Sequence, residues 1–255
     1  MESATLKLRE NTLKAKALPR HIGIIMDGNG RWAESHGRPR LEGHREGSSS
    51  VRDVTRCARR LGVQALTLYA FSSQNWQRPS LEVVGLMELL REYLLKERSE
   101  ILDNQIRLNA IGNLEKLPGY VREPLDALRE ESVRNTGMVL TLALSYGGRE
   151  ELVRAMRSLA SRIERGETTA GAITEADVER ELWTCDLPPV DLIIRTSGEN
   201  RVSNFLLWQG AYAEYVFTDT LWPDFRAHEL LDCIEQFQNR ERRFGLTSAQ
   251  LRAIP

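Results

Sequence analysis

The stretch "HIGIIMDGNGRWA", residues 21–33, places a short apolar run directly before a glycine-rich polar loop. The run over residues 21–26 is apolar on both faces, as a strand inside a parallel sheet is. In the loop, Gly28 and Gly30 let the backbone turn sharply and approach a ligand closely. A buried strand that ends in such a loop is typical of α/β proteins, which bind ligands at the carboxyl ends of their strands.

The same alternation continues through the chain. Further apolar runs that read as strands lie at residues 65–71, 106–112, 138–146, 190–196 and 214–219. Helical patterns lie between them, near residues 45–61, 81–103, 120–134, 148–165, 174–184 and 226–242. Strands that alternate with helices favour a parallel sheet joined by right-handed crossovers. We therefore predict an α/β fold in a single domain, with a central, mostly parallel six-stranded sheet flanked by helices.

The composition of the chain excludes several classes of protein and of site. The chain has 255 residues, of which 41% are hydrophobic, enough for one sizeable core. Its net charge of -1 gives no basic field for nucleic acid, so no nucleic-acid partner is expected. The three cysteines, Cys57, Cys185 and Cys233, are far apart, which indicates neither disulfides nor a zinc site and fits a reducing cytoplasm. Neither a signal peptide nor a membrane-spanning run is evident.

Four polar clusters follow predicted strands. They are "DGNGR" after the first strand, "SSQNWQR" after the second, "YGGRE" after the fourth and "RTSGENRVSN" after the fifth. The carboxyl ends of parallel strands meet at one edge of a sheet. We therefore expect the four clusters to form a single site.

The first cluster indicates a phosphate site. Gly28, Gly30 and Arg31, followed by a helix start, favour an anion. Asp27 would repel phosphate unless a cation lies between them, and Mg²⁺ binds through one or two carboxylates plus substrate phosphates. The alternative is an aspartate that only caps a helix or turn. The loop also matches the dinucleotide pattern G-x-G-x-x-A, but the next strand lacks the acid that would hold a ribose.

The other clusters add polar and cationic groups. Arg40 and His44 are four residues apart and can share a helical face directed at the phosphate site, whereas Arg38 and Arg45 read as solvated. The hydroxyl and amide groups of "SSQNWQR" favour substrate positioning, with a polar turn around a core tryptophan as the alternative. The fifth-strand cluster supplies a second phosphate clamp, formed by Arg195, Arg201 and Ser203, with Glu199 and Glu214 as added carboxylates. Two phosphate sites indicate a reaction between two phosphorylated substrates.

The helical pattern over residues 81–103 is apolar on more than one face. Such a wide arc favours burial in the core. The alternative is that one side packs on the sheet while the other lines a slot for an apolar ligand.

Seven segments together carry a family resemblance. They are "HIGIIMDGNGRWA", "GH" at 43–44, "LTLYAFSSQNWQRP", "SYGGRE", "DLIIRTSGENRVSNFLLWQGAYAEYVF", "LWPDF" and "NRERRFG". In this order and spacing, from about residue 20 to 245, the chain resembles the cis-prenyltransferase (isoprenyl transferase) family, most closely its bacterial undecaprenyl diphosphate synthases. Small departures, Ser145 and "TSGEN" in place of the commoner "TGGEH", touch no position that the family uses for metal or catalysis.

The resemblance implies an activity. Isopentenyl diphosphate would be added sequentially to an allylic diphosphate primer, farnesyl diphosphate, to give a long-chain polyprenyl diphosphate. Undecaprenyl diphosphate, for the cell-wall lipid carrier, is the expected product, and a shorter- or medium-chain product is the alternative. The resemblance covers residues 20–245, which we predict to be the catalytic domain with a hydrophobic tunnel. The mixed-charge start over 1–19 reads as a flexible or loosely helical N-terminal arm, and residues 246–255 as a C-terminal tail.

The resemblance also implies roles for residues. Asp27 and Glu214 would hold Mg²⁺, with Glu214 acting partly across a dimer contact. Asp27 and Asn75 would be catalytic, Asn75 as the family's proposed proton acceptor. The substrate-binding positions would be Gly28, Asn29, Gly30, Arg31, Trp32, Arg40, His44, Ser72, Ser73, Gln74, Trp76, Arg78, Arg195, Arg201, Val202, Ser203 and Arg243.

The expected assembly is a cytoplasmic homodimer that contacts the membrane peripherally to release product. Two rivals remain at this stage. A nucleotide-dependent oxidoreductase would rest on the glycine pattern alone. A catalytically silent partner subunit would lack the metal aspartate and the asparagine loop, which this chain retains. An all-helical trans-type synthase is contradicted, because such enzymes carry paired DDxxD motifs and this chain has no adjacent aspartates.

Overall fold

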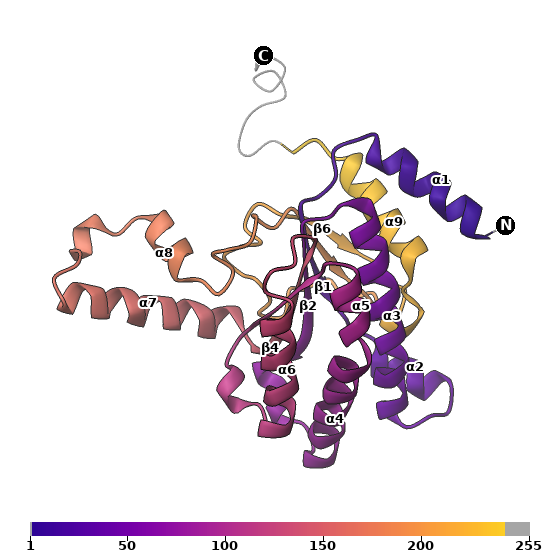
Figure 1. The fold of residues 1–255 in the computed structure, drawn as a ribbon, viewed down its shortest axis with the longest axis horizontal. Coiled ribbons are helices and arrows are strands. Elements are labelled where there is room, and N and C mark those ends of the chain that lie inside the picture. The colour runs from indigo at the N-terminus through magenta and orange to yellow at the C-terminus, as the bar shows by residue number, and fades with distance from the viewer. Residues whose placement is uncertain (1, 243–255) are drawn as a thin grey trace.

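Six parallel strands form one sheet in the order β3-β4-β2-β1-β5-β6 (Figure 1). This computed structural model describes residues 2–242. The strands are β1 His21–Ile25, β2 Ala65–Ser72, β3 Arg107–Ile111, β4 Val139–Tyr146, β5 Leu192–Arg195 and β6 Glu214–Phe217. The predicted α/β class and the six strands are confirmed, and every strand pair is parallel.

Helices fill most of the connections. They are α1 Glu2–Lys14, α2 Asn29–Ser35, α3 Arg40–Leu61, α4 Ser80–Lys96, α5 Arg98–Asp103, α6 Gly119–Glu131, α7 Gly148–Glu164, α8 Glu175–Glu181 and α9 Ala227–Gln238. Short 3-10 turns are η1 Ser73–Gln77, η2 Leu114–Lys116, η3 Ala170–Ala172 and η4 Trp222–Asp224. The single helix predicted over 81–103 is divided at Glu97, whose buried carboxylate pairs with Arg52 of α3 at 3.0 Å.

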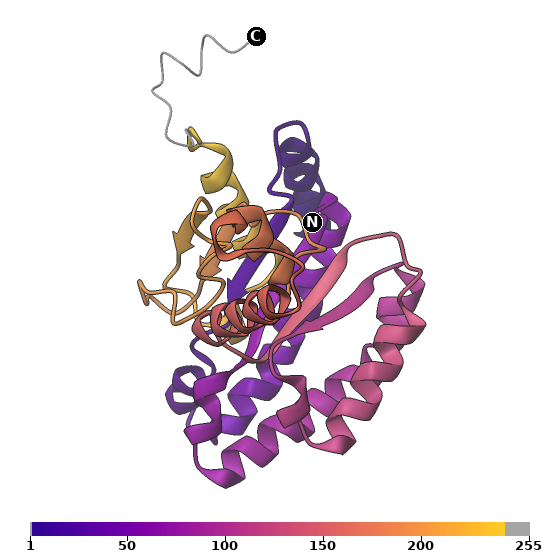
Figure 2. The same cartoon turned by 90° about the vertical axis from the view of Figure 1, so that its left-hand side faces the viewer.

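The two faces of the sheet are covered differently. Alternate side chains of β1 point to opposite sides, so Ile24 joins the large core and Ile25 a smaller one. Helices α3, α4, α6 and α9 contribute buried side chains to the large core. Phe205 and Leu206, from the irregular segment between β5 and β6, pack the other face. Helices α7 and α8 project sideways from the sheet (Figure 1 and Figure 2).

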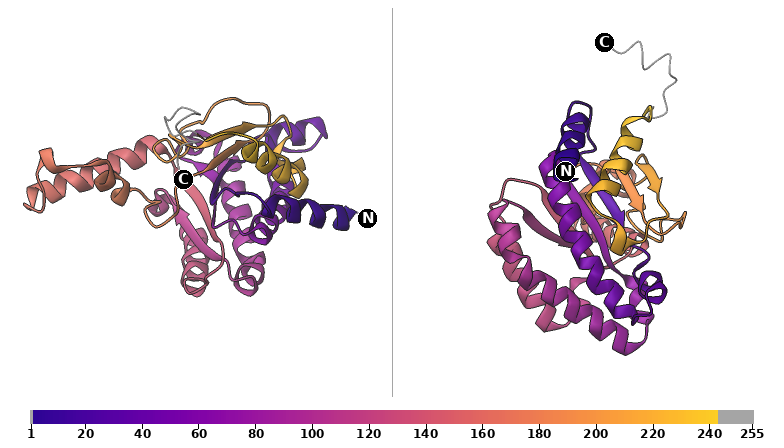
Figure 3. Two further views of the ribbon diagram at one scale, coloured as in Figure 1. Left: turned by 90° about the horizontal axis from the view of Figure 1, so that it is seen from above. Right: turned by 90° about the vertical axis from the view of Figure 1, so that its right-hand side faces the viewer.

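The N-terminal segment is docked on the domain. Helix α1 buries Leu13, and its Glu10 pairs with Arg60 of α3 at 2.7 Å. Arg9 pairs with Asp232 of α9 at 2.6 Å, and Figure 3 shows α1 lying along this side of the molecule. These contacts join α1 to residues distant in the sequence. The division into an N-terminal arm and a catalytic domain stays a prediction, and the predicted tail over 246–255 lies outside the described residues. Within residues 2–242, no helix combines the length and the apolar character needed to cross a bilayer.

Candidate active site

Two glycines bring the loop after β1 against its neighbours. Gly28 has φ +104°, and a Cβ there would lie 2.9 Å from the side chain of Leu221. A Cβ on Gly30 would lie 2.6 Å from the guanidinium of Arg40. Only glycine fits at both positions without displacing these groups. The loop therefore closes onto the segment after β6 and onto the start of α3.

Asp27 lies at the centre of the loop. Its Oδ2 accepts a hydrogen bond from Arg195 Nη2 at 2.8 Å, and Arg31 Nη2 is 4.0 Å away. Its Oδ1 accepts from the amide of Gly28 at 2.7 Å. Burial alone would raise the pKa of Asp27, but the bonds from Arg195 and Gly28 outweigh it and hold the pKa below the ordinary value. The carboxylate is therefore ionised at neutral pH and still partly open to solvent.

Arg195 joins the first and fifth clusters. It is buried at the end of β5, and its Nη1 reaches Ser203 Oγ at 2.6 Å and the carbonyl of Arg201. The same guanidinium therefore contacts Asp27 on one side and the Ser203 loop on the other. Arg201 itself pairs with Glu199. The structure brings both predicted phosphate clusters together through one buried cation.

The loop after β2 is held by one internal hydrogen bond and by bonds to Ser145 and Glu150. Asn75 Oδ1 accepts a hydrogen bond from the backbone N–H of Ser72 at 3.0 Å, which leaves the side-chain NH₂ as its free group. Trp76 donates its indole N–H to Ser145 Oγ at 2.9 Å. Ser73 donates to Glu150 at 2.6 Å, and Gln74 donates to the same carboxylate at 3.3 Å. Asn75 is thus placed as a donor rather than as a base.

Cations also line the start of α3 and α4. Arg78 pairs with Glu82 at 2.9 Å, and Arg40 pairs with Glu34 at 2.7 Å. Burial lowers the pKa of His44 to about 4, and the positive charge of Arg78 acts in the same direction. His44 is therefore neutral at neutral pH. Among residues 2–242, neither of its ring nitrogens has a hydrogen-bond partner.

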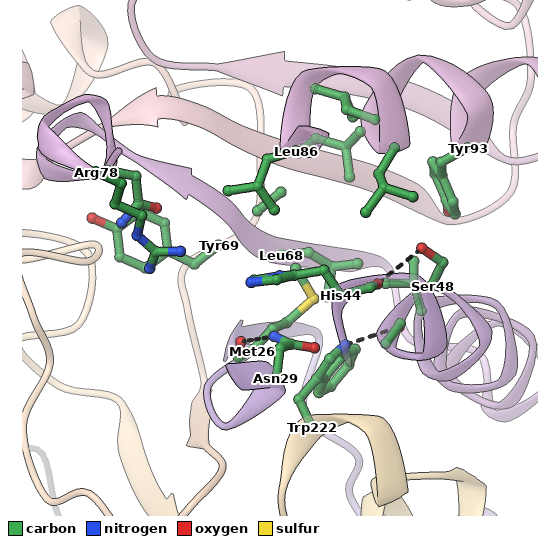
Figure 4. Close-up of a pocket in the computed structure, with 17 residues that line it drawn as sticks. Met26, Asn29, His44, Ser48, Leu68, Tyr69, Arg78, Leu86, Tyr93 and Trp222 are labelled. Atoms are coloured by element: carbon green, nitrogen blue, oxygen red, sulfur yellow. Dashed lines mark hydrogen bonds between the residues drawn. The ribbon is translucent and has the colours of Figure 1, made fainter. Parts of the chain in front are cut away.

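A cavity of about 170 Å³ opens beside these groups (Figure 4). His44 and Arg78 line it at one end, and Tyr93 lies at the end away from Arg78. Its lining includes Met26, Asn29, Leu68, Leu86, Leu89 and Leu90. Met87 and Leu94 on another side of α4 are buried in the core. One side of α4 therefore packs in the core, and another side lines a cavity that has both polar and apolar walls. That this cavity, the channel, holds an apolar ligand stays a prediction.

Of the predicted site residues in the described part of the chain, four line this cavity: Asn29, His44, Asn75 and Arg78. Trp32 is buried and donates its indole N–H to Asp224 at 2.8 Å, so it packs α2 onto η4. Asn29 lies in the lining, where its Nδ2 donates to the carbonyl of Met26 at 3.0 Å. Val202, between Arg201 and Ser203, is only partly buried. Arg243 lies outside the described residues.

Glu214 lies away from Asp27 within one chain. It begins β6 in register with Leu192, whereas the carboxyl-terminal residue of β5, Arg195, is level with Ile25. Three strand residues at about 3.3 Å each separate these levels by roughly 10 Å. Glu214 also pairs with Arg240 at 2.9 Å. The predicted pair of metal carboxylates is therefore not formed inside the described chain.

Several residues of the site were not singled out from the sequence. Thr196 donates to the carbonyl of Asp27 at 2.6 Å and accepts from its amide at 2.9 Å. Ser197 accepts from Arg31. Glu150 joins the Ser73 loop to Asn204, which donates to it at 2.9 Å. The signal for all three was their place in polar clusters after buried strands, but only the tertiary contacts show that Glu150 reaches the Ser73 loop.

The donor set at Asp27 fits a divalent cation that is completed by substrate. Within residues 2–242, no three acidic, histidine or cysteine side chains form a closed metal cage. Asp27 supplies one ionised carboxylate beside an open space lined by arginines. Mg²⁺ is commonly held by one or two carboxylates together with substrate phosphates. Asp27 is therefore the residue that would hold such an ion, once a phosphorylated ligand is bound.

The chain matches known proteins over nearly its full length. Residues 25–245 match the family described as putative undecaprenyl diphosphate synthase. An isoprenyl transferase of Chlorobaculum tepidum is 50% identical over 95% of this chain and 92% of its own. A ditrans,polycis-undecaprenyl-diphosphate synthase, (2E,6E)-farnesyl-diphosphate specific, of Vibrio vulnificus is 46% identical over 97% of this chain and 98% of its own.

A solved structure agrees with these relatives. Lavandulyl diphosphate synthase from Lavandula x intermedia, in complex with dimethylallyl diphosphate, superposes with a TM-score of 0.88 at 38% identity. The match covers 89% of this chain and 98% of the other. Fold and sequence therefore point to the same group of transferases, and the chain belongs to the undecaprenyl diphosphate synthase family of prenyltransferases.

Proposed function

We propose that this protein adds isopentenyl diphosphate units sequentially to farnesyl diphosphate and makes undecaprenyl diphosphate. The main support is the geometry of Arg195, which links the cluster around Asp27 to the cluster around Ser203. A cavity with several aliphatic side chains in its lining adjoins the first cluster, because Met26 and Asn29, on either side of the Asp27–Gly28 turn, line it. One reaction can thus use two diphosphates and one hydrocarbon chain. The Vibrio vulnificus relative, described as farnesyl-diphosphate specific, supports the choice of primer.

The two diphosphates occupy different clusters in this scheme. The primer diphosphate lies against Asp27 and the loop that ends at Arg31, with its hydrocarbon tail in the channel. The diphosphate of the second substrate lies against Arg195, Arg201 and Ser203. The C–O bond of the primer breaks, its diphosphate departs, and the double bond of isopentenyl diphosphate forms the new C–C bond. A proton is then lost from the adduct.

The residues of the chain stabilise the departing charge and place the proton. The arginines act on the leaving diphosphate by electrostatic preorganisation, where the loss of one well-placed donor costs roughly 3–4 kcal/mol. Asn75 cannot serve as a strong base, because its carbonyl oxygen already accepts from Ser72. It orients the adduct through its NH₂ group. A departing diphosphate oxygen accepts the proton.

We infer that Mg²⁺ is required and that Asp27 holds it together with the primer diphosphate. The ion would neutralise charge on the leaving group. Glu214 begins β6 at the other level of the sheet, so it could join a metal site only from a second copy of the chain. A homodimer is therefore part of the proposal, and in it Arg243 would act at the neighbouring site.

Chain growth follows from the apolar channel. Each carbon transferred from water gains about 0.8 kcal/mol, so a five-carbon unit gains roughly 4 kcal/mol. Elongation remains favourable until the channel is filled, and the apolar product then leaves slowly. We propose that the enzyme works in the cytoplasm and delivers product through peripheral contact with the membrane. Added detergent should therefore speed steady-state turnover, and an unchanged rate would contradict slow release.

The test is an extension assay with farnesyl diphosphate, radiolabelled isopentenyl diphosphate and Mg²⁺, followed by chain-length analysis. We expect products of eleven isoprene units and no product in the presence of excess EDTA. Products that stop at a few units would favour the shorter-chain alternative. The absence of any extension would contradict the proposed function.

A further inference from the structure

Ser197 has a backbone conformation that is costly for a residue with a side chain. Its φ is +79°, and Gly198 follows at +74°. Turns with positive φ at both central residues are dominated by glycine, asparagine and aspartate. Non-glycine residues in this region cost free energy and persist where the surroundings enforce them. A serine at this position therefore calls for a reason in its side chain.

The surroundings enforce the turn from the segment after β6. The N–H of Ser197 donates to the carbonyl of Thr220 at 2.9 Å. The N–H of Gly198 donates to the carbonyl of Thr218 at 2.8 Å. These two bonds fix the backbone after β5 whatever side chain residue 197 carries. The side chain of Ser197 is therefore a separate feature.

That side chain lies between the glycine loop and Arg31. Ser197 is buried, and its Oγ accepts a hydrogen bond from Arg31 Nη2. Its Cβ is close enough to Gly28 that a Cβ on the glycine would approach it to 3.0 Å. There is no room for a larger side chain between the two loops without a shift of one of them.

Arg31 has two competing acidic neighbours. Its Nη2 is 4.0 Å from Asp27 and 3.8 Å from Glu199. The guanidinium is about half exposed, so without a further bond it would be free to turn toward either carboxylate. The Ser197 hydroxyl is a neutral acceptor that holds the guanidinium between them. It does so without cancelling the positive charge that a diphosphate needs.

We propose that Ser197 is a positioning residue that holds Arg31 in the orientation that receives the primer diphosphate. This rests on the proposed function. Among residues 2–242, Ser197 makes no hydrogen bond to Arg195, Arg201 or Ser203, which form the second anion cluster. Its direct contact is therefore with the primer side of the site, through Arg31. The hydroxyl of Ser197, rather than its backbone, is the feature that acts on Arg31.

Two substitutions separate the hydroxyl from the backbone strain. Ser197→Gly and Ser197→Ala both remove the bond to Arg31, whereas only glycine relieves the positive φ. We expect the KM for farnesyl diphosphate to rise about tenfold in both variants, because a hydrogen bond to a charged group is lost. The KM for isopentenyl diphosphate should stay within about twofold of the wild-type value. Ser197→Gly should melt about 2–4 °C above Ser197→Ala.

A matched control tests strain alone. Gln105 also has a positive φ, +56°, at an exposed position after α5. Gln105→Gly should raise the melting temperature and leave both KM values unchanged. If Ser197→Gly also left the primer KM unchanged, or if both KM values rose together, Ser197 would not be a positioning residue for the primer.

The outcome for the wild-type chain separates this inference from the proposed function. If the wild-type chain extends farnesyl diphosphate, the two variants test Ser197 as described. If it does not, the proposed function fails and the Ser197 variants are compared by thermal protection with magnesium pyrophosphate. Stronger protection of the wild type than of Ser197→Gly would still support a diphosphate-positioning role, and equal protection would overturn it.

Discussion

The two ends of the sheet use the same kinds of residue in opposite ways. At the amino end, the side chain of Asp191 is 4% exposed and accepts from the amide of Arg20 at 2.7 Å and from Arg242 at 2.6 Å. At the carboxyl end, the side chain of Asp27 is 34% exposed and pairs with Arg195 at 2.8 Å. The first carboxylate is enclosed by its partners. The second keeps an open side toward the space where a ligand would enter.

The histidines show the same contrast. His21 is buried at the amino end, and its ring nitrogens lie 2.8 Å from the carbonyl of Pro188 and 2.7 Å from Thr67 Oγ1. Burial lowers its pKa to about 4, as it does for His44. The difference is that His44 faces the channel without such partners among the described residues. A lowered pKa therefore does not by itself mark the site, and the two histidines differ instead in their hydrogen-bond partners.

Cavity size is also a poor guide to the site. The amino end has a cavity of about 820 Å³ that Arg20, Asp191 and Trp208 line, several times larger than the channel at the carboxyl end. Its Asp191 carboxylate and its His21 ring are already paired. The smaller channel joins unpaired polar groups to an apolar interior. This is the combination that a hydrocarbon diphosphate needs.

The largest expected effect comes from exchanging one carboxylate at each end for an amide. Asp27→Asn should lower kcat about 100- to 1000-fold, because charge stabilisation at the leaving group is lost. Asp191→Asn should lower the free energy of unfolding by about 2–3 kcal/mol, because buried donors lose their anion. Steady-state kinetics measures the change in kcat, and urea unfolding measures the change in the free energy of unfolding. An inactive but stable Asp191→Asn variant would reverse the assignment of the two ends.

The histidines give a pH-dependent effect of intermediate size. Both folded-state pKa values are lowered, so the unfolded chain binds more protons between about pH 6.5 and pH 4. The stability they contribute is complete above this window and is lost as the pH falls through it, by about 2–3 kcal/mol for each histidine. Urea unfolding at several pH values would show this slope.

Substitution then distinguishes the two histidines. His21→Asn should flatten the pH slope and lower stability at neutral pH, because the bonds to Pro188 and Thr67 are no longer both made. His44→Gln should flatten the slope with a smaller loss of stability but reduce turnover. Equal losses of turnover in the two variants would contradict the contrast between the ends.

The smallest expected effect concerns product length. Tyr93→Ala should lengthen the products by about one five-carbon unit, because the ring at the far end of the channel is removed. Tyr93→Phe keeps the ring and should leave the length unchanged. Trp208→Ala enlarges the cavity at the amino end and serves as the matched control. Chain-length analysis measures both variants. A change of product length in Trp208→Ala would mean that the growing chain occupies the amino-end cavity and would contradict its placement beside Tyr93.

Local pattern was sufficient for most of the fold and for the centre of the site. Parallel strands bring the loops together at one edge of the sheet, so the sequence pattern places Asp27, Asn75 and Arg195 near one another. The place of Glu214 could not be predicted in this way, because it depends on the register of β6 against β5. The match of Glu214 to the family pattern does not show whether its side chain lies at the amino or the carboxyl end of the sheet.

Long-range packing explains the other differences. Trp32 stands next to the glycine loop in sequence, but its indole bonds to Asp224, nearly two hundred positions away. The sequence of α1 predicts an arm, because its ion-pair partners Arg60 and Asp232 are distant in the sequence. The backbone of Ser197 is set by the carbonyl of Thr220. Each depends on contacts between segments that no local pattern brings together.

The most direct measurement is a crystal structure with Mg²⁺ and a non-reactive thio analogue of farnesyl diphosphate. We expect the diphosphate to lie within hydrogen-bonding distance of Arg31, a cation to bridge it to Asp27, and the hydrocarbon chain to enter the channel toward Tyr93. A diphosphate bound instead beside Arg20 and Arg242 at the amino end, with Asp27 unliganded, would contradict the assignment of the active site.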